Sequence, residues 1–291
     1  MLVSLQIGFA MSLMVSGLIF CVLMLFPAEF RAEEVIHIRH YHLQPRHGFA
    51  LKLLELVLEK NGVPYRIEAV QSPEVLTEGR VEKMVVNGEL DMLFISTSAE
   101  RERTMIPIKV PIYRGLLGLR LLLITPENNE KFKNITTLKQ LKPYVAGHNP
   151  HWSDFHVFKE NGLRVVSSTN YQLLFEMLKH GRFDYFSRGV NEVWGELALH
   201  SDDLIIADNI MLFYQHPVYF FVSKHRPDLA AVLEQGLAKA TKDGSYRALF
   251  DRYYADTLKK ANLNNRTMIF LNNTAVPAGT APIDTSWWLT P

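Results

Sequence analysis

Strand and helix patterns alternate regularly over residues 33–96, and this alternation limits the chain to a small number of folds. Short β-rich or apolar runs are separated by segments whose apolar residues recur at helical spacing. Strands that are connected through helices pair in parallel under right-handed crossovers. The segment therefore predicts an α/β fold, with strands at 33–43, 65–71 and 90–96 and helices at 48–62 and 78–87.

A second α/β set follows and indicates a second lobe. It opens with a strand pattern at 115–124, continues through three strands and two helices, and ends before a strand at 217–223 and two helices at 228–261. We predict that the second lobe is inserted into the first through two crossing strands, with a ligand between the lobes outside the carboxyl ends of the strands. The predicted boundaries are 33–116 and 214–270 for the first lobe, 117–213 for the second lobe and 271–291 for a C-terminal tail.

The N-terminal segment predicts export from the cytoplasm. Residues 2–26 carry no charged side chain, so residues 1–32 are interpreted as a cleaved signal peptide or, alternatively, a retained membrane anchor. The only cysteine, Cys21, lies inside this segment, which leaves the exported part without thiol chemistry or disulfides. The 31 Lys and Arg residues balance 30 Asp and Glu residues, so no global field favours nucleic acid. We expect a periplasmic protein that binds no nucleic acid.

Four segments match a known family in order and spacing: 86–115, 138–149, 174–186 and 218–254. With them the chain resembles the type II periplasmic solute-binding proteins, in particular the amino-acid-binding branch that serves ABC transporters, over nearly all of residues 35–255. The resemblance implies a small-molecule solute, hinge closure of two lobes and an ABC permease as partner. We expect a monomer without a cofactor, and a binding protein rather than an enzyme.

The same resemblance implies that Ser98 and Arg101, in the sequence "SAER", hold the carboxylate of a ligand. The chemistry suits this role, because a planar guanidinium donates two parallel hydrogen bonds to a carboxylate. The alternative is that Arg101 belongs to a solvated loop, since it lies within the alternating charges of "ERER".

The stretch "FDYFSRGVNEVW", residues 183–194, departs from the family pattern. Gly189 stands where the resemblance implies an Asp that takes the ligand's ammonium group, and Arg188 directly precedes it. We therefore predict a solute with anionic or strongly accepting groups, held between Arg101 on one lobe and Arg188 on the other, with Glu192 able to compensate the charge. The alternative is that Arg188 pairs with Asp184 or Glu192 and contacts no ligand.

Further candidate ligand contacts follow two predicted strands. His148 and Trp152 lie in "GHNPHWSDFH", residues 147–156, where an indole ring can stack on a ligand or, alternatively, form a hydrophobic staple at the helix start. Tyr41 ends the first strand, at a place where the resemblance implies a cleft aromatic.

Readings from other classes remain open. The motif "HIRHYH", residues 37–42, suggests a metal, but only two of its three histidines share a strand face, so we expect none. Glu192 or Asp184 can act as a general acid if the fold hosts a dehydratase-like enzyme. A stand-alone sensing or scaffold protein is the other alternative to a transport protein.

Overall fold

The computed structural model describes residues 35–41, 48–74 and 76–281, and its first part has the predicted alternation. Strand β1 pairs in parallel with β2, with Ile38 opposite Ile67. Helix α2 ends at Asn61, because Gly62 takes up a positive φ of 69° that a glycine adopts without strain. The elements are β1 (Ile36–His40), α2 (Gly48–Asn61), β2 (Tyr65–Ala69), α3 (Glu78–Val86) and β3 (Met92–Ser96).

A three-stranded sheet in the order β3-β11-β4 completes the first lobe. Strand β11 (Val218–Val222) lies antiparallel between β3 and β4 (Ile106–Ile108), and every residue of β3 and β11 is buried. Helix α10 (Pro227–Lys242) packs on α2 so closely that a Cβ on Gly236 would lie 2.2 Å from the Val57 carbonyl oxygen. The short helix α4 (Ala99–Thr104) follows β3.

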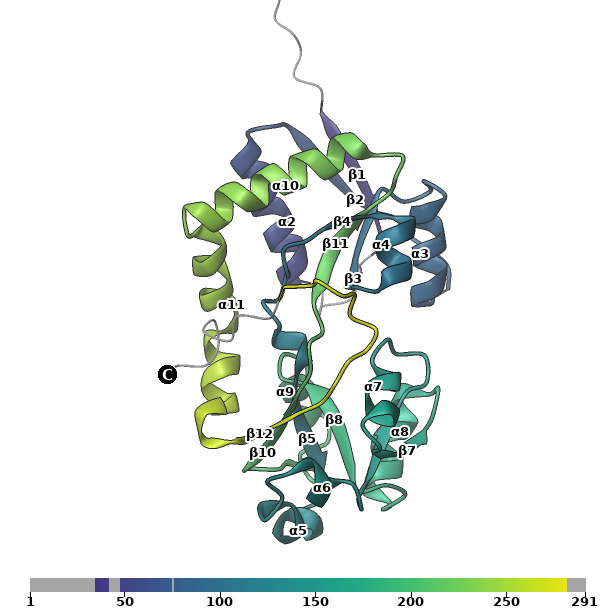
Figure 1. The fold of residues 1–291 in the computed structure, drawn as a ribbon, viewed down its shortest axis with the longest axis vertical. Coiled ribbons are helices and arrows are strands. Elements are labelled where there is room, and N and C mark those ends of the chain that lie inside the picture. Colours follow the sequence, from purple (N-terminus) through teal and green to yellow (C-terminus); the bar gives the residue numbers. More distant parts are fainter. Residues whose placement is uncertain (1–34, 42–47, 75, 282–291) are drawn as a thin grey trace, which may run out of the picture. The chain divides into compact units, whose positions relative to one another are not determined.

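The second lobe is built on a larger mixed sheet, in the order β12-β10-β5-β8-β6-β7, with β9 also paired to β5 (Figure 1). Strand β5 runs antiparallel to β8 and β10, whereas β6 is parallel to β7 and β8. Its strands are β5 (Leu119–Ile124), β6 (Val145–His148), β7 (Arg164–Ser167), β8 (Tyr185–Gly189), β9 (Ile205–Ile206), β10 (Ile210–Phe213) and β12 (Thr267–Phe270). Its helices are α5 (Asn129–Lys133), α6 (Leu138–Leu141), α7 (Phe155–Glu160), α8 (Tyr171–Lys179) and α9 (Val193–Ala198).

Two segments, one from β4 to β5 and one from β10 to β11, insert the second lobe into the first as predicted, and a third segment leads from α11 (Ser245–Ala261) to β12. The first two segments, called the connecting segments below, touch where the Tyr214 N–H donates to the Gly118 carbonyl oxygen at 3.2 Å. A Cβ on Gly118 would lie 2.0 Å from the Tyr214 carbonyl oxygen, so only glycine permits this approach. The described residues from Ile36 onwards, which include both lobes, form one compact unit.

The chain after helix α11 (Ser245–Ala261) corrects the prediction that residues up to 270 return to the first lobe. Thr267–Phe270 form β12, which pairs in parallel with β10 and covers an edge of the larger sheet. Ile269 and Leu271 are buried there, although we predicted the first lobe for residue 269 and a C-terminal tail for residue 271. The other lobe boundaries stay a prediction.

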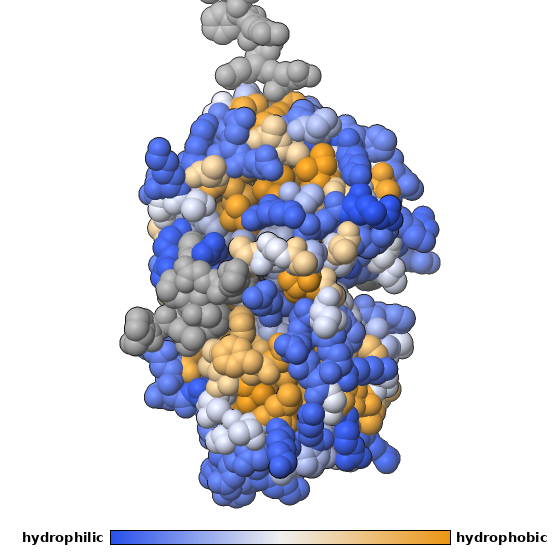
Figure 2. Space-filling view, in the orientation of Figure 1, coloured by the Kyte–Doolittle hydropathy of each residue, from blue (hydrophilic) through white to orange (hydrophobic). Residues whose placement is uncertain are grey.

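Two further features concern the membrane and the surface. Residues 1–32, the predicted signal peptide or anchor, lie outside the described residues, and within the described ranges no helix has the length and apolarity to span a bilayer. Figure 2 shows hydrophilic side chains over most of one face, interrupted by apolar groups on both lobes.

Candidate functional site

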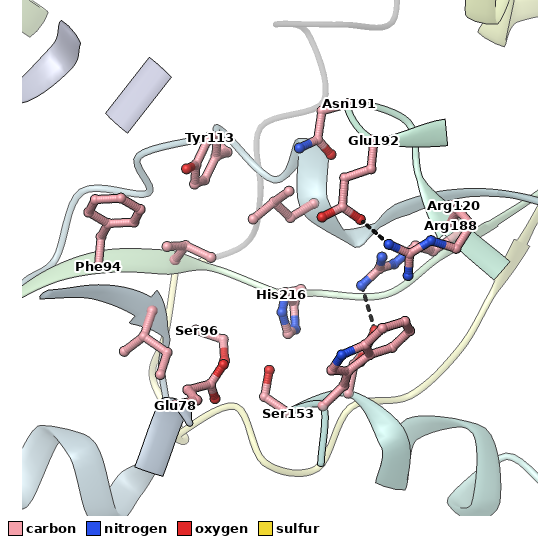
Figure 3. Close-up of a pocket in the computed structure, with 15 residues that line it drawn as sticks. Glu78, Phe94, Ser96, Tyr113, Arg120, Ser153, Arg188, Asn191, Glu192 and His216 are labelled. Atoms are coloured by element: carbon pink, nitrogen blue, oxygen red, sulfur yellow. Dashed lines mark hydrogen bonds and ion pairs between the residues drawn. The ribbon is translucent and has the colours of Figure 1, made fainter. Parts of the chain in front are cut away.

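A cavity of about 180 Å³ lies between the two lobes. Strand β3 supplies one wall, the two connecting segments supply the floor, and β5, β8 and the loops after β6 and β8 supply the opposite wall (Figure 3). The polar and aromatic side chains that line it are Glu78, Phe94, Ser96, Tyr113, Arg120, Trp152, Ser153, Asp154, Arg188, Asn191, Glu192 and His216.

A buried ion pair between Arg120 and Asp154 stands at the second-lobe wall. Arg120 Nη2 donates to Asp154 Oδ2 at 2.5 Å, and Arg120 Nε donates to the Tyr214 hydroxyl at 2.7 Å, which itself donates to Asp154 Oδ2. Burial alone would raise the pKa of the Asp154 carboxyl, but the charge of Arg120 holds that pKa well below its usual range. Nη1 of Arg120 makes no hydrogen bond to any described residue, so it is available to a ligand in the cavity.

Two histidines beside this ion pair are neutral near pH 7. His148 is buried with its Nε2 3.6 Å from Asp154 Oδ1, and burial lowers its pKa. Burial also lowers the pKa of His216 to about 4, against the opposing effect of Asp154. Arg120 and Asp154 therefore balance one another without a charged histidine.

Arg188, on β8, is 4% exposed and pairs with two carboxylates of its own lobe. Its Nε and Nη2 donate to Glu196 at 2.8 and 2.6 Å, and its Nη2 donates to Glu192 at 3.0 Å. The guanidinium also lies 4.6 Å from the centre of the Trp152 ring. Burial acts to lower its pKa, but Glu192 and Glu196 raise it, so the group stays charged. Arg188 thus agrees in part with both hypotheses from the sequence. It pairs with Glu192, as the alternative to ligand contact has it, and it also lines the cavity.

Side chains of neighbouring residues fill the space that a side chain at Gly189 would occupy. A Cβ at this position would lie 2.8 Å from Asn191 Oδ1, 3.1 Å from Glu192 Oε2 and 3.4 Å from Arg120 Nη1. A carboxylate is therefore present where residue 189 contributes none, and it comes from Glu192. Asn191 Oδ1 is buried and accepts no hydrogen bond among the described residues. This wall consequently combines an unused acceptor with unused guanidinium donors.

Arg101 and Ser98 line a second, adjoining cavity of about 280 Å³, which shares Ser96, Ser153 and His216 with the first. All five donors of the Arg101 guanidinium are occupied: Glu82 accepts two hydrogen bonds, Glu78 one, and the Ser96 carbonyl and hydroxyl one each. Ser98 Oγ accepts from the Arg101 backbone N–H at 3.2 Å and caps α4. A ligand carboxylate must displace Glu78 or Glu82 to reach Arg101.

The predicted residues are thus only partly brought together. Trp152, Arg188 and Glu192 line the first cavity, and Ser98 and Arg101 line the second. Tyr41 lines neither, since its hydroxyl accepts from the Leu76 N–H at 3.0 Å, and His148 is covered by neighbouring rings. Ligand contact by each of these residues stays a prediction.

Several cavity residues were missed in the sequence: Arg120, Asp154, Asn191 and His216. A usable signal was present for Arg120, which is the one charge in the apolar stretch 115–124 and therefore needs a buried partner. Among the described residues no cluster of three metal-ligating side chains occurs, and His42 lies outside them.

Comparison with known proteins places the fold. No family model and no curated protein matches the chain. Solved structures do: an ancestral arginine-binding protein bound to arginine has 17% identity and a TM-score of 0.53, covering 76% of this chain and 98% of its own. The VFT2 domain of Bordetella pertussis BvgS has 15% identity and a TM-score of 0.56, covering 75% and 92%. An ancestral amino-acid-binding protein, a precursor of cyclohexadienyl dehydratase, has 15% identity and a TM-score of 0.52, covering 76% and 95%.

These likenesses and the topology define the class. The chain has the two-lobe α/β fold of the periplasmic solute-binding proteins, and the cavity described above lies between its lobes.

Proposed function

We propose that the protein is an extracytoplasmic solute-binding protein, which captures a small polar solute between its lobes by hinge closure and delivers it to an ABC-type importer. The observation that supports this function is the cavity wall formed by Arg120, Arg188 and Asn191. It carries hydrogen-bonding groups that no described residue uses, at the boundary between two lobes. Of these groups, Asn191 Oδ1 is buried without a hydrogen-bond partner, which is costly, so a bound solute that pairs with it is stabilised.

The charges at this wall define the chemistry of the solute. Nη1 of Arg120 and Nη1 of Arg188 form no hydrogen bond to a described residue and favour an acceptor such as a carboxylate. Both guanidinium ions are already balanced by Asp154, Glu192 and Glu196, so a purely anionic solute gains less than the arginines alone suggest. Asn191 Oδ1 favours a donor. An amino-acid-like solute, with an acceptor and a donor close together, fits best.

The position of these groups supports the proposed hinge closure. Arg120 lies on β5 next to one connecting segment, and its partner Tyr214 lies on the other segment. A solute that binds Arg120 therefore touches the hinge itself, while Ser96 and Phe94 approach it from the first lobe. Closure of two domains around a ligand is a common response in such an arrangement.

A thermal-shift screen of the full chain tests the proposal. Individual amino acids and small dicarboxylates are added, the melting temperature is measured, and the concentration of each solute is followed with time. We expect at least one solute to raise the melting temperature without being consumed. Consumption of a solute indicates an enzyme instead, and the absence of stabilisation by every solute contradicts the proposal.

The partner needs a separate experiment, because a sensor uses the same cleft without a transporter. The solute-loaded and solute-free protein are each incubated with membranes of the source cells, and bound membrane proteins are identified by crosslinking and mass spectrometry. Solute-dependent crosslinking to an ABC permease is the expected result. Crosslinking to a signalling protein favours the sensing alternative.

A further inference from the structure

The chain beyond β12 is fastened to helix α7 of the second lobe. The Asn161 side chain exchanges two hydrogen bonds with the backbone of Asn272, at 2.8 and 2.9 Å. The Glu160 carboxylate accepts from the backbone N–H of Thr274 at 3.0 Å and from its hydroxyl at 2.6 Å. These contacts hold the segment by its backbone, so its course does not depend on the side chains alone.

Asn273 joins the same segment to a second place, the connection between the lobes. Its Oδ1 lies 2.9 Å from His156 Nε2 on α7, and its Nδ2 donates to the Gln215 carbonyl oxygen at 2.8 Å. Gln215 belongs to the segment from β10 to β11, next to His216 of the cavity. Figure 1 shows this part of the chain passing from β12 to the level between the two lobes.

Residues 273–276 also form a wall of the second cavity. Asn273, Ala275 and Val276 line it together with Ser98 and Arg101 of the first lobe. The two cavities adjoin one another, because Ser153 and His216 line both. The solute cleft is therefore bordered on this side by a peptide segment that belongs to neither lobe's core.

We propose that residues 272–276, which we name the C-terminal wall, close the cleft on the α4 side and select solutes by size. A short solute is enclosed at Arg120 and Arg188, whereas a longer one must pass along Ala275 and Val276 or displace them. This inference rests on the proposed function for its biological meaning, but the closure itself is testable without any solute.

Cysteine accessibility measures this closure. Ser153 lines both cavities, and its hydroxyl makes no hydrogen bond to a described residue, so Ser153→Cys in a Cys21→Ser background of the full chain places a single thiol in the cleft. The rates of labelling by methanethiosulfonate ethylammonium and by a bulky biotin-linked methanethiosulfonate are measured. Their ratio reports the width of the passage, since it cancels changes in thiol reactivity that affect both reagents alike.

Detaching the wall is expected to widen the passage. The double variant Asn161→Ala, Asn273→Ala removes the two hydrogen bonds to the Asn272 backbone and the bonds of Asn273 to His156 and Gln215. We expect the labelling rate of the bulky reagent to rise roughly tenfold relative to that of the small reagent. Asn265→Ala is the matched control, because Asn265 is exposed and, within the described part of the chain, its side chain bonds only to Asn262. We expect the control to leave the ratio unchanged.

A second variant has the opposite expected sign. Ala275→Trp adds bulk to the same wall and should slow the bulky reagent more than the small one. If the ratio of the two labelling rates is unchanged in Ala275→Trp, the inference is overturned. This test remains valid even if the double variant does not fold. Because no solute is used, this failure is distinct from failure of the thermal-shift screen.

Discussion

Arg120 and Asp154 form a buried ion pair, with Nη2 of the arginine 2.5 Å from Oδ2 of the aspartate, and this pair joins β5 to the loop that leads into α7. Their side chains are only 9% and 6% exposed. The Tyr214 hydroxyl bonds to both residues from the second connecting segment. The same three residues thus fix one wall of the cavity and tie it to the segment between β10 and β11.

Replacing Asp154 with Asn should strongly destabilise the protein. The variant keeps the shape of the side chain but leaves the Arg120 charge buried without its carboxylate. Breaking a buried ion pair in this way costs about 3–5 kcal/mol. Urea unfolding measures the change, with Glu130→Gln as control, since Glu130 pairs with Lys133 at an exposed position. A loss below about 1 kcal/mol for Asp154→Asn, the range of exposed pairs, contradicts this account of the pair.

Stability should decrease as the pH falls from about 6.5, the ordinary pKa of histidine, towards the folded-state value of about 4 for His216. In this window the unfolded chain binds a proton at residue 216 that the folded chain does not, so acid favours unfolding. One such group contributes a slope of at most about 1.4 kcal/mol per pH unit. Urea unfolding at a series of pH values should show a shallower slope for His216→Gln. His148 and His40, whose pKa values are also lowered by burial, should account for part of the slope that remains. An equal slope in both proteins contradicts the assignment to His216.

Asn191→Ala should weaken solute binding without changing stability. Asn191 Oδ1 accepts no hydrogen bond among the described residues, so its removal breaks none of their hydrogen bonds at that atom. We expect the free energy of unfolding to stay within about 0.5 kcal/mol. Affinity for a solute found in the screen should fall by about tenfold, the effect of one lost hydrogen bond. Calorimetric titration provides the affinity, and Asn265→Ala is the control. Unchanged affinity shows that Asn191 faces no ligand.

Gly118→Ala should separate the two connecting segments. The added Cβ would lie 2.0 Å from the Tyr214 carbonyl oxygen, a backbone atom that cannot move independently. Overpacking of this kind costs about 1–3 kcal/mol or more. Gly195→Ala is the matched control, because a Cβ there meets no atom within 4 Å. Equal thermal stability of the two variants contradicts the close approach of the segments.

The fold was largely predictable because its main elements follow from local patterns. The predicted last helix, residues 245–261, coincides with α11, and the fully buried strand β3 reads as an apolar run. Strands β10 and β12 were missed because they are four residues each and pair across a long interval of sequence. Such pairing depends on which edge strand of the sheet is unpaired, and a local sequence pattern does not indicate which edge that is.

The site was less predictable, because the partners of its charged groups are distant in sequence. From the aromatic and charged stretch 183–194 we predicted ligand contacts by Arg188 and Glu192; both line the cavity, and the contacts themselves stay a prediction. No local pattern indicated that Glu82, on α3 and 19 residues away in sequence, accepts hydrogen bonds from Arg101. Arg101 and Arg188, which we predicted to hold one solute between them, therefore line different cavities. Arg120, and not Arg101, shares the first cavity with Arg188.

The most direct test of the proposed function is a crystal structure of the full chain with a solute that stabilises it in the thermal-shift screen. The account predicts solute density in the cavity between the lobes, with an acceptor atom within hydrogen-bonding distance of Nη1 of Arg120 or Arg188 and a donor facing Asn191. Solute bound elsewhere, with this cavity holding only water, would contradict it.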